Sequence, residues 1–183
     1  MAYLMAVEGV VYVDEAVAIP AVRGYLERFL AREAIPTLAE IPGHPAAEYG
    51  RVVLGRYANT GVRDQIARLC IDGTAKFPSF LIPTIERQLE LDGPVDCAAL
   101  ALAGWARYLA TVPETARAQD PHGEQAAALA AKSFDDPRAF LEFDLVFTPR
   151  LRESERFGDA FVRAAGLLEA HGSVGAIERL LRE

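Results

Sequence analysis

Two basic side chains, Arg68 and Lys76, lie eight residues apart in the segment RYANTGVRDQIARLCIDGTAKFPSF, residues 56–80. Lys76 is conspicuous because the chain has 17 arginines and one other lysine, Lys132. An arginine and a lysine that point into one pocket supply several charge-assisted hydrogen-bond donors, which are roughly twice as strong as neutral ones. Such donors suit a ligand that is rich in hydroxyl groups or carries a carboxylate.

The same two side chains also have an ordinary structural interpretation. Asp64 lies four residues before Arg68, and an ion pair at this spacing stabilises a helix by roughly 0.3 to 0.5 kcal/mol. Lys76 would complement the dipole of a helix that ends just before it. Spacing alone favours this local role over a shared pocket.

A short helix should position both donors. The pattern predicts an amphipathic helix over residues 62–71, capped by Asn59 or Thr60 and ended by Gly73 in a left-handed conformation. Its inward positions are Val62, Ile66, Leu69 and Cys70. Arg68 is rotated by about 200° from Ile66 and therefore points away from the core. Lys76 is then expected in the loop that follows.

Most of the remaining chain has helical spacing, and no segment alternates over strand length. Helices are expected over residues 20–38 with a break at Pro36, and over 46–57, 83–91, 95–112, 125–133, 137–143, 154–170 and 173–181. The segment 95–112 is apolar nearly all round, which predicts a central helix surrounded by others. Residues 113–124 are polar and predict a surface loop. The fold class is therefore all-α, with one domain over residues 1–183.

Composition restricts the kind of partner. The 183 residues are 51% hydrophobic and carry a net charge of -7, which argues against a nucleic acid or an anionic membrane surface. Cys70 and Cys97 are too few for a disulfide framework, so a reducing cytoplasm is the expected location. The three histidines lack metal-ligand spacing, and no metal is expected. No apolar run approaches the length of a membrane span, and neither GxGxxG nor GxxxxGK[ST] supplies a nucleotide-binding loop.

The spacing of the 56–80 segment resembles the signature of the polyol-specific long-chain dehydrogenases, of which mannitol 2-dehydrogenase is the type. That signature has the form R-F-x-N-P-x-I-x-D, a spaced Arg, then D-G-S-x-K-x-P-x-F. The matching positions here are Arg56, Asn59, Val62, Asp64, Arg68, Asp72, Gly73, Thr74, Lys76, Pro78 and Phe80, while Tyr57 replaces Phe and Thr60 replaces Pro. The segments AYLMAVEGVVYVDEAV and AALALAGWARYL also resemble helices of the family, so the similarity extends to about Leu109.

The resemblance implies a C-terminal, substrate-binding domain of the 6-phosphogluconate dehydrogenase C-terminal-like kind. In the family an N-terminal Rossmann domain binds NAD, and that domain is absent from this chain. The catalytic motif K-x4-N-x2-H would end just before Met1, so no catalytic residue is expected here and the isolated chain should be inactive. Arg68 and Lys76 match positions that bind substrate hydroxyls, which favours the shared pocket. The expected partners are a polyol or ketose and the Rossmann domain.

Three further expectations remain open. A sugar-acid reductase of the fructuronate or tagaturonate type is an alternative, because an arginine and a lysine also suit a carboxylate. A non-catalytic helical binding or scaffold module is a second alternative, favoured by the missing cofactor loop. The first helix, beginning MAYLMAV, is expected to expose apolar surface without the Rossmann domain, which predicts self-association of the chain.

Overall fold

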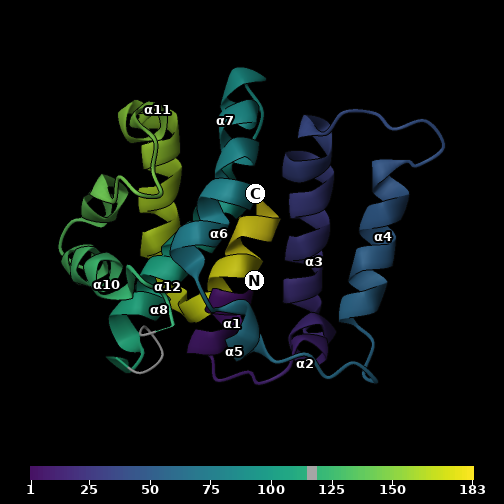
Figure 1. Ribbon diagram of the computed structural model, residues 1–183, viewed down its shortest axis with the longest axis horizontal. Helices are drawn as coiled ribbons and strands as arrows, with labels where there is room; N and C mark the ends of the chain where they lie inside the picture. The colour runs from purple at the N-terminus through teal and green to yellow at the C-terminus, as the bar shows by residue number, and fades with distance from the viewer. Residues whose placement is uncertain (115–118) are drawn as a thin grey trace.

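The computed structural model describes residues 1–114 and 119–183, and within these ranges the chain is built from helices without a strand (Figure 1). The nearest approach to a strand is one antiparallel bridge between Tyr12 and Gln65. The prediction of an all-α fold is therefore confirmed. None of the described helices combines the length and the apolar character that a membrane span requires.

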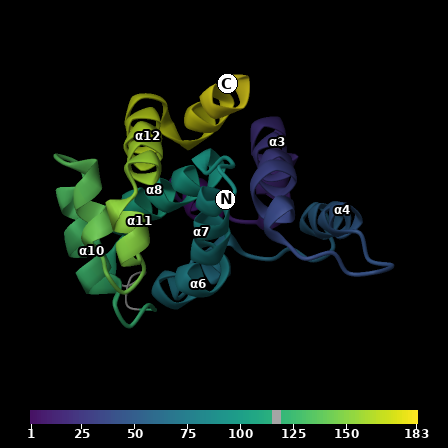
Figure 2. The same cartoon turned by 90° about the horizontal axis from the view of Figure 1, so that it is seen from above.

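The helix α8, Asp96–Thr111, forms the centre of the molecule and confirms the prediction for residues 95–112. Its side chains are buried nearly all round, with Leu100, Leu102 and Trp105 at most 1% exposed. It packs against α1 (Ala2–Val7), α10 (Gly123–Lys132) and α12 (Glu155–Arg182), as Figure 2 shows for α10 and α12. A helix can be this apolar only because other helices cover it on several sides.

The long helix α12 is bent where the sequence predicted two separate helices. Gly172 has a φ of 67°, a left-handed conformation that glycine adopts without strain, and it divides α12 near the expected boundary. Beyond the kink, the backbone N–H of Ser173 donates to Glu8 over 2.7 Å. This bond ties the C-terminal part of α12 to the end of α1.

The first helix does not expose the apolar surface that the sequence led us to expect. Tyr3, Leu4 and Met5 of α1 are at most 8% exposed, since α1 lies against α8. A Cβ atom at Gly104 would come within 2.5 Å of Leu4, so the two helices approach as closely as a glycine permits. The location proposed for self-association was therefore wrong, while self-association itself stays a prediction.

The helix α4, Ala46–Tyr57, lies at the edge of the molecule beyond α3 (Pro20–Phe29), as both views show (Figures 1 and 2). Its bounds match the prediction. The spacing of Tyr49, Val52, Val53 and Tyr57 predicts an apolar stripe that faces the core, but Tyr49 and Val52 are 66% and 57% exposed. Only Gly50 and Leu54 of α4 are buried.

The other predicted helices occur in order with shifted ends, and the structure adds helices that the sequence did not predict at Val13–Ala18, Gly73–Phe80 and Pro149–Glu153. The segment 20–38 divides into α3, a π-helical turn η1 (Leu30–Ala34) and a 3-10 turn η2 (Ile35–Thr37), as the break at Pro36 predicted. The remaining elements are α2 (Val13–Ala18), α5 (Ile66–Leu69), α6 (Gly73–Phe80), α7 (Ile82–Glu90), the 3-10 helix η3 (Pro137–Glu142) and α11 (Pro149–Glu153). The predicted loop over 113–124 falls partly on residues 115–118, which lie outside the described residues.

Candidate functional site

The helix predicted over residues 62–71 is shortened to the four residues of α5. Tertiary contacts keep Asp64 and Gln65, just before it, in an extended path: the N–H of Val13 donates to the carbonyl of Asp64 over 2.9 Å, and the N–H of Ile66 donates to the carbonyl of Val11 over 2.9 Å. Val62, expected in the core, is 60% exposed, whereas Ile66 is buried as predicted. Asn59 therefore accepts from the N–H of Gly61 in a local turn and caps no helix.

Arg63 anchors this extended path. Its guanidinium carbon lies 3.6 Å from the centre of the Tyr12 ring. Its Nη1 atom lies 3.4 Å from Asp14 and 3.2 Å from Glu15. Arg63 also adopts a φ of 47°, which is uncommon for a side chain of this size. The cation–π contact and the two ion pairs together hold the chain in a conformation that its own preferences disfavour.

The corner between α5 and α6 depends on Gly73, but in a different way from that predicted. The left-handed residue is Asp72, with a φ of 55°, and Gly73 begins α6 instead of ending the helix before it. A Cβ atom at Gly73 would lie 2.5 Å from Tyr3 Oη and 2.8 Å from Trp105 Nε1. The Tyr3 hydroxyl in turn donates to the carbonyl of Cys70 over 3.3 Å. The corner is thus pressed directly onto α1 and α8.

Lys76 lies in the first half of α6, not in the expected loop. Its ammonium Nζ lies 3.4 Å from the carbonyl oxygen of Leu69, at the C-terminal end of α5. The half-buried side chain lines a cavity of about 370 Å³. Other walls of this cavity are apolar or aromatic and include Leu69, Phe77, Phe80 and, from α4, Tyr57. Lys76 therefore presents a charged donor in a largely apolar hollow, a common composition for a small-molecule site.

Arg68 is exposed and forms the local ion pair that its spacing predicted. Its Nε donates to Asp64 Oδ1 over 2.7 Å, and its Nη2 donates to the other carboxylate oxygen, so the pair is bidentate. The hydrogen bond from Arg68 lowers the pKa of Asp64 below its usual value, and the Asp64 carboxylate raises the pKa of Arg68. The Arg68 side chain is 64% exposed and therefore remains accessible to a ligand.

The structure does not bring the two predicted donors into one cavity, since Arg68 is not among the residues that line the cavity of Lys76. The ammonium of Lys76 contacts the carbonyl of Leu69, the residue directly after Arg68. Asp64, the partner of Arg68, lines a second cavity of about 380 Å³. Tyr57 belongs to the walls of both cavities.

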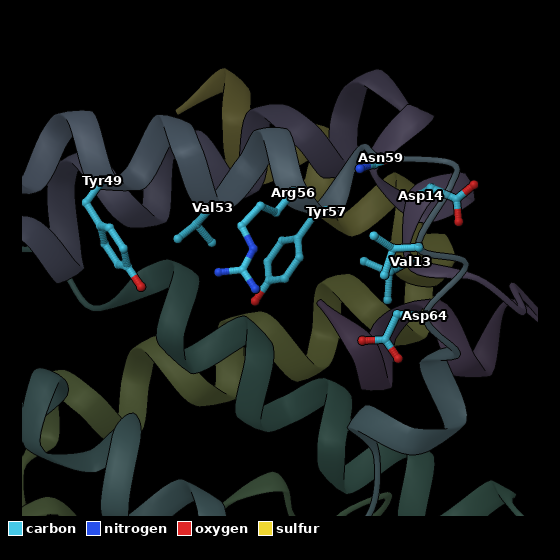
Figure 3. A pocket seen from close by; sticks show the side chains of 9 residues that line it. Val13, Asp14, Tyr49, Val53, Arg56, Tyr57, Asn59 and Asp64 are labelled. Carbon is cyan, nitrogen blue, oxygen red and sulfur yellow. The ribbon is translucent and has the colours of Figure 1, made fainter.

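Two residues of α4 also lie in this region, although the sequence did not assign them to a site. Figure 3 shows Arg56 and Tyr57 side by side, both pointing from α4 into the pocket that they line. Both belong to the RYAN segment, which was used only as part of the family signature. The sequence pattern that could have identified them is an adjacent basic and aromatic residue at the exposed end of a helix. No group of three or more potential metal-ligating side chains occurs among the described residues.

Comparison with known proteins identifies the fold around these cavities. The family model for the mannitol dehydrogenase C-terminal domain matches residues 1–168. Mannitol dehydrogenase DSF1 of Saccharomyces cerevisiae is 31% identical over 99% of this chain and 37% of its own length. Mannitol 2-dehydrogenase of Phaeosphaeria nodorum is 32% identical over 97% of this chain and 31% of its own length. The chain thus spans about a third of the length of these relatives.

A solved structure is similar over the same extent. Mannitol 2-dehydrogenase of Pseudomonas fluorescens, in a ternary complex with NAD and D-mannitol, superposes with a TM-score of 0.91 at 29% identity, covering 99% of this chain and 37% of that one. A D-sorbitol dehydrogenase shares the fold with a TM-score of 0.81 at 22% identity. These matches cover the helices that carry Lys76 and Arg68. The chain belongs to the mannitol dehydrogenase C-terminal domain family, a family of oxidoreductase domains.

Proposed function

We propose that the chain is the substrate-binding domain of an NAD-dependent polyol dehydrogenase that interconverts mannitol, or a related polyol, and fructose, or a related ketose. The observation that carries the proposal is the position of Lys76, which lines the cavity and whose ammonium lies 3.4 Å from the carbonyl oxygen of Leu69, the residue after Arg68. Lys76 and Arg68 act as donors to substrate hydroxyls. An N-terminal Rossmann domain outside this chain binds NAD, which accepts or supplies the hydride, and the proton-transfer residues also lie outside residues 1–183.

The charge balance at Arg68 favours a neutral polyol over a sugar acid. The bidentate Asp64 carboxylate already neutralises the guanidinium, so a second carboxylate would have to compete with Asp64 for the same donors. A hydroxyl group needs only one free N–H and can join the pair without displacing Asp64. We therefore place the fructuronate or tagaturonate type of reductase second. We also place the enzyme in the cytoplasm, since Cys70 and Cys97 are buried free thiols.

The DNA upstream of the Met1 codon separates the enzyme from the non-catalytic module. An in-frame K-x4-N-x2-H motif preceded by a dinucleotide-binding GxGxxG segment supports a dehydrogenase. A stop codon followed by a ribosome-binding site directly before Met1 contradicts it and supports the module. The same reading frame provides the longer protein for kinetic measurements.

The kinetic test replaces each donor in that longer protein. Arg68→Ala and Lys76→Ala should each lower kcat/KM for mannitol roughly 10- to 100-fold, since a lost hydrogen bond to a charged group costs about 1.5 to 3 kcal/mol. NAD affinity, measured by fluorescence, should barely change. Lys132→Ala is the matched control because Lys132 is exposed on α10. The double variant should lose less than the sum if both donors hold one substrate.

A collapse of NAD affinity with an unchanged Michaelis constant for mannitol would contradict the assignment. Faster reduction of a sugar acid than of fructose would support the sugar-acid reductase instead. The isolated 183-residue chain should show no hydride transfer with NAD and mannitol above a buffer control.

A further inference from the structure

The helix α6, which carries Lys76, is capped by a residue distant in sequence. Asp72 occupies the N-cap position, but its own side chain accepts no capping hydrogen bond from α6. The acceptor comes from Asp120, 46 residues after Thr74. Asp120 Oδ2 accepts from both the backbone N–H and the hydroxyl of Thr74, each over 2.8 Å. One carboxylate oxygen thus holds two donors in the first turn of α6.

Asp120 is itself held rigidly. It is 9% exposed, and its second oxygen, Oδ1, accepts from the N–H of His122 over 3.1 Å. Its backbone carbonyl accepts from the N–H of Gly123 over 2.9 Å, at the start of α10. Since α10 packs on α8, the carboxylate is fixed to the central helix. Hydrogen bonds that involve an ionised group are shorter and stronger than neutral ones, so this is an effective clamp.

The clamp acts on the turn that carries Lys76. Thr74 and Lys76 lie in the first turn of α6, where the N–H of Lys76 donates to the carbonyl of Asp72 over 3.1 Å. Gly73, beside Thr74, is wedged against Tyr3 and Trp105. With Asp120 in place, the start of α6 is therefore fixed from two sides. Without it, two donors of the first turn lose their acceptor, and α6 is held by the contacts of Gly73 and by the ring of Phe77, which lies 4.7 Å from that of Trp105.

We propose that Asp120 is a positioning residue, which clamps Thr74 so that the first turn of α6 holds the Lys76 ammonium at the cavity beside Leu69. The clamp involves residues of this chain alone. Its consequence for substrate affinity rests on the proposed function. The alternative is that Asp120 contributes only to global stability and leaves the placement of Lys76 unchanged in the folded protein.

The two lysines of the chain permit a direct test. Reductive methylation with ¹³C-formaldehyde labels Lys76 and Lys132, and the variant Lys132→Arg assigns their signals. The NMR spectra of the 183-residue chain are compared with those of Asp120→Ala, Asp120→Asn, Thr74→Ser and a control, Asp144→Ala, in which an exposed aspartate is replaced. Urea unfolding of each variant measures global stability in parallel.

We expect the Lys76 signal of Asp120→Ala to move toward the position of a methylated lysine in the unfolded chain, while the Lys132 signal stays in place. The Lys76 signal of Asp120→Asn should lie between the signals of the original chain and of Asp120→Ala, because asparagine keeps a neutral acceptor. Thr74→Ser should keep the original Lys76 signal, since both donors remain, and Asp144→Ala should change neither signal. An unchanged Lys76 signal in folded Asp120→Ala, whatever its stability, overturns the proposal.

A second variant covers the case in which Asp120→Ala does not fold. Thr74→Val removes the hydroxyl donor and keeps the backbone donor, so the Lys76 signal should shift part of the way. A Thr74→Val spectrum identical to the original would then overturn the proposal. In the longer enzyme, Asp120→Ala should raise the Michaelis constant for mannitol about 2- to 30-fold, the range that corresponds to loss of a helix cap, and Asp120→Asn should raise it less. A shifted Lys76 signal without this kinetic effect would leave the clamp standing and refute the substrate role of Lys76.

Discussion

Glu33 is the buried carboxylate whose removal should cost the most stability. It lies in the π-helical turn η1, is 2% exposed, and accepts from the N–H of Cys97 over 2.7 Å and of Ala98 over 2.9 Å. These two N–H groups belong to the first turn of the central helix α8, which has no side-chain cap of its own. Gln88 fixes the turn from the other side, since its Nε2 donates to the carbonyl of Glu33 over 2.6 Å.

Glu33→Ala leaves two buried N–H groups without an acceptor, and each such group costs about 1 to 3 kcal/mol. Part of this cost is offset, because the ionised carboxylate of Glu33 is poorly solvated and its removal relieves that penalty. The same burial raises the pKa of Glu33. We therefore expect a net loss of about 2 to 5 kcal/mol in the free energy of unfolding. For a domain of this size the melting temperature should fall by roughly 5 to 15 °C.

Urea unfolding followed by circular dichroism measures the loss. Glu27→Ala is the matched control, because Glu27 lies nearby on α3, is 52% exposed and forms a surface ion pair with Arg23. Such a pair is worth at most about 1 kcal/mol. Glu33→Gln keeps one acceptor oxygen, so its free energy of unfolding should lie between those of Glu33→Ala and Glu27→Ala. If Glu33→Ala proves no less stable than Glu27→Ala, the capping role assigned to Glu33 is refuted.

Four further predictions concern the interior. Gly73→Ala places a Cβ atom 2.8 Å from Trp105 Nε1, so overpacking should cost about 1 to 3 kcal/mol and shift the emission of the single tryptophan; unchanged emission and stability would contradict the close approach. Burial raises the pKa of Cys70 to about 12 and that of Cys97 well above its usual value, so a thiol reagent at pH 8 should react at least about 100-fold more slowly with the native chain than in urea. Because the folded state binds these thiol protons more tightly than the unfolded chain, the free energy of unfolding should decline as the pH rises above about 9, which alkaline urea titrations measure. Tyr25→Phe removes the 2.7 Å hydrogen bond to the Cys97 carbonyl, so its free energy of unfolding at pH 7 should be about 1 kcal/mol lower. Burial also raises the pKa of the Tyr25 phenol, so the free energy of unfolding of this variant should decline less at alkaline pH than that of the original chain. An equal decline would argue against the raised pKa of Tyr25.

Residue type and local spacing determined most of the helices. The apolar run of α8 predicted a central helix, the pattern of residues 46–57 predicted the bounds of α4, and Pro36 marked the break after α3. Each of these signals acts within a few turns of backbone, where rotation per residue and the missing N–H of proline restrict the chain directly. The spacing of Arg68 and Lys76 similarly indicated both the local ion pair with Asp64 and a candidate site.

Only the tertiary structure decided the features that depend on residues distant in sequence. Residues 62–65 leave the predicted helix because the backbone of Val11 and Val13 forms hydrogen bonds with Ile66 and Asp64, partners that no local pattern specifies. Tyr49 and Val52 of α4 are exposed although local spacing places them on an apolar stripe, whereas Tyr57 of the same helix lines two cavities. The carboxylates of Glu33 and Asp120 cap helices whose first turns lie 64 and 46 residues away. Any of several acidic residues has the chemistry for that role, and the packing of the helices brings these two within hydrogen-bond distance of the free N–H groups.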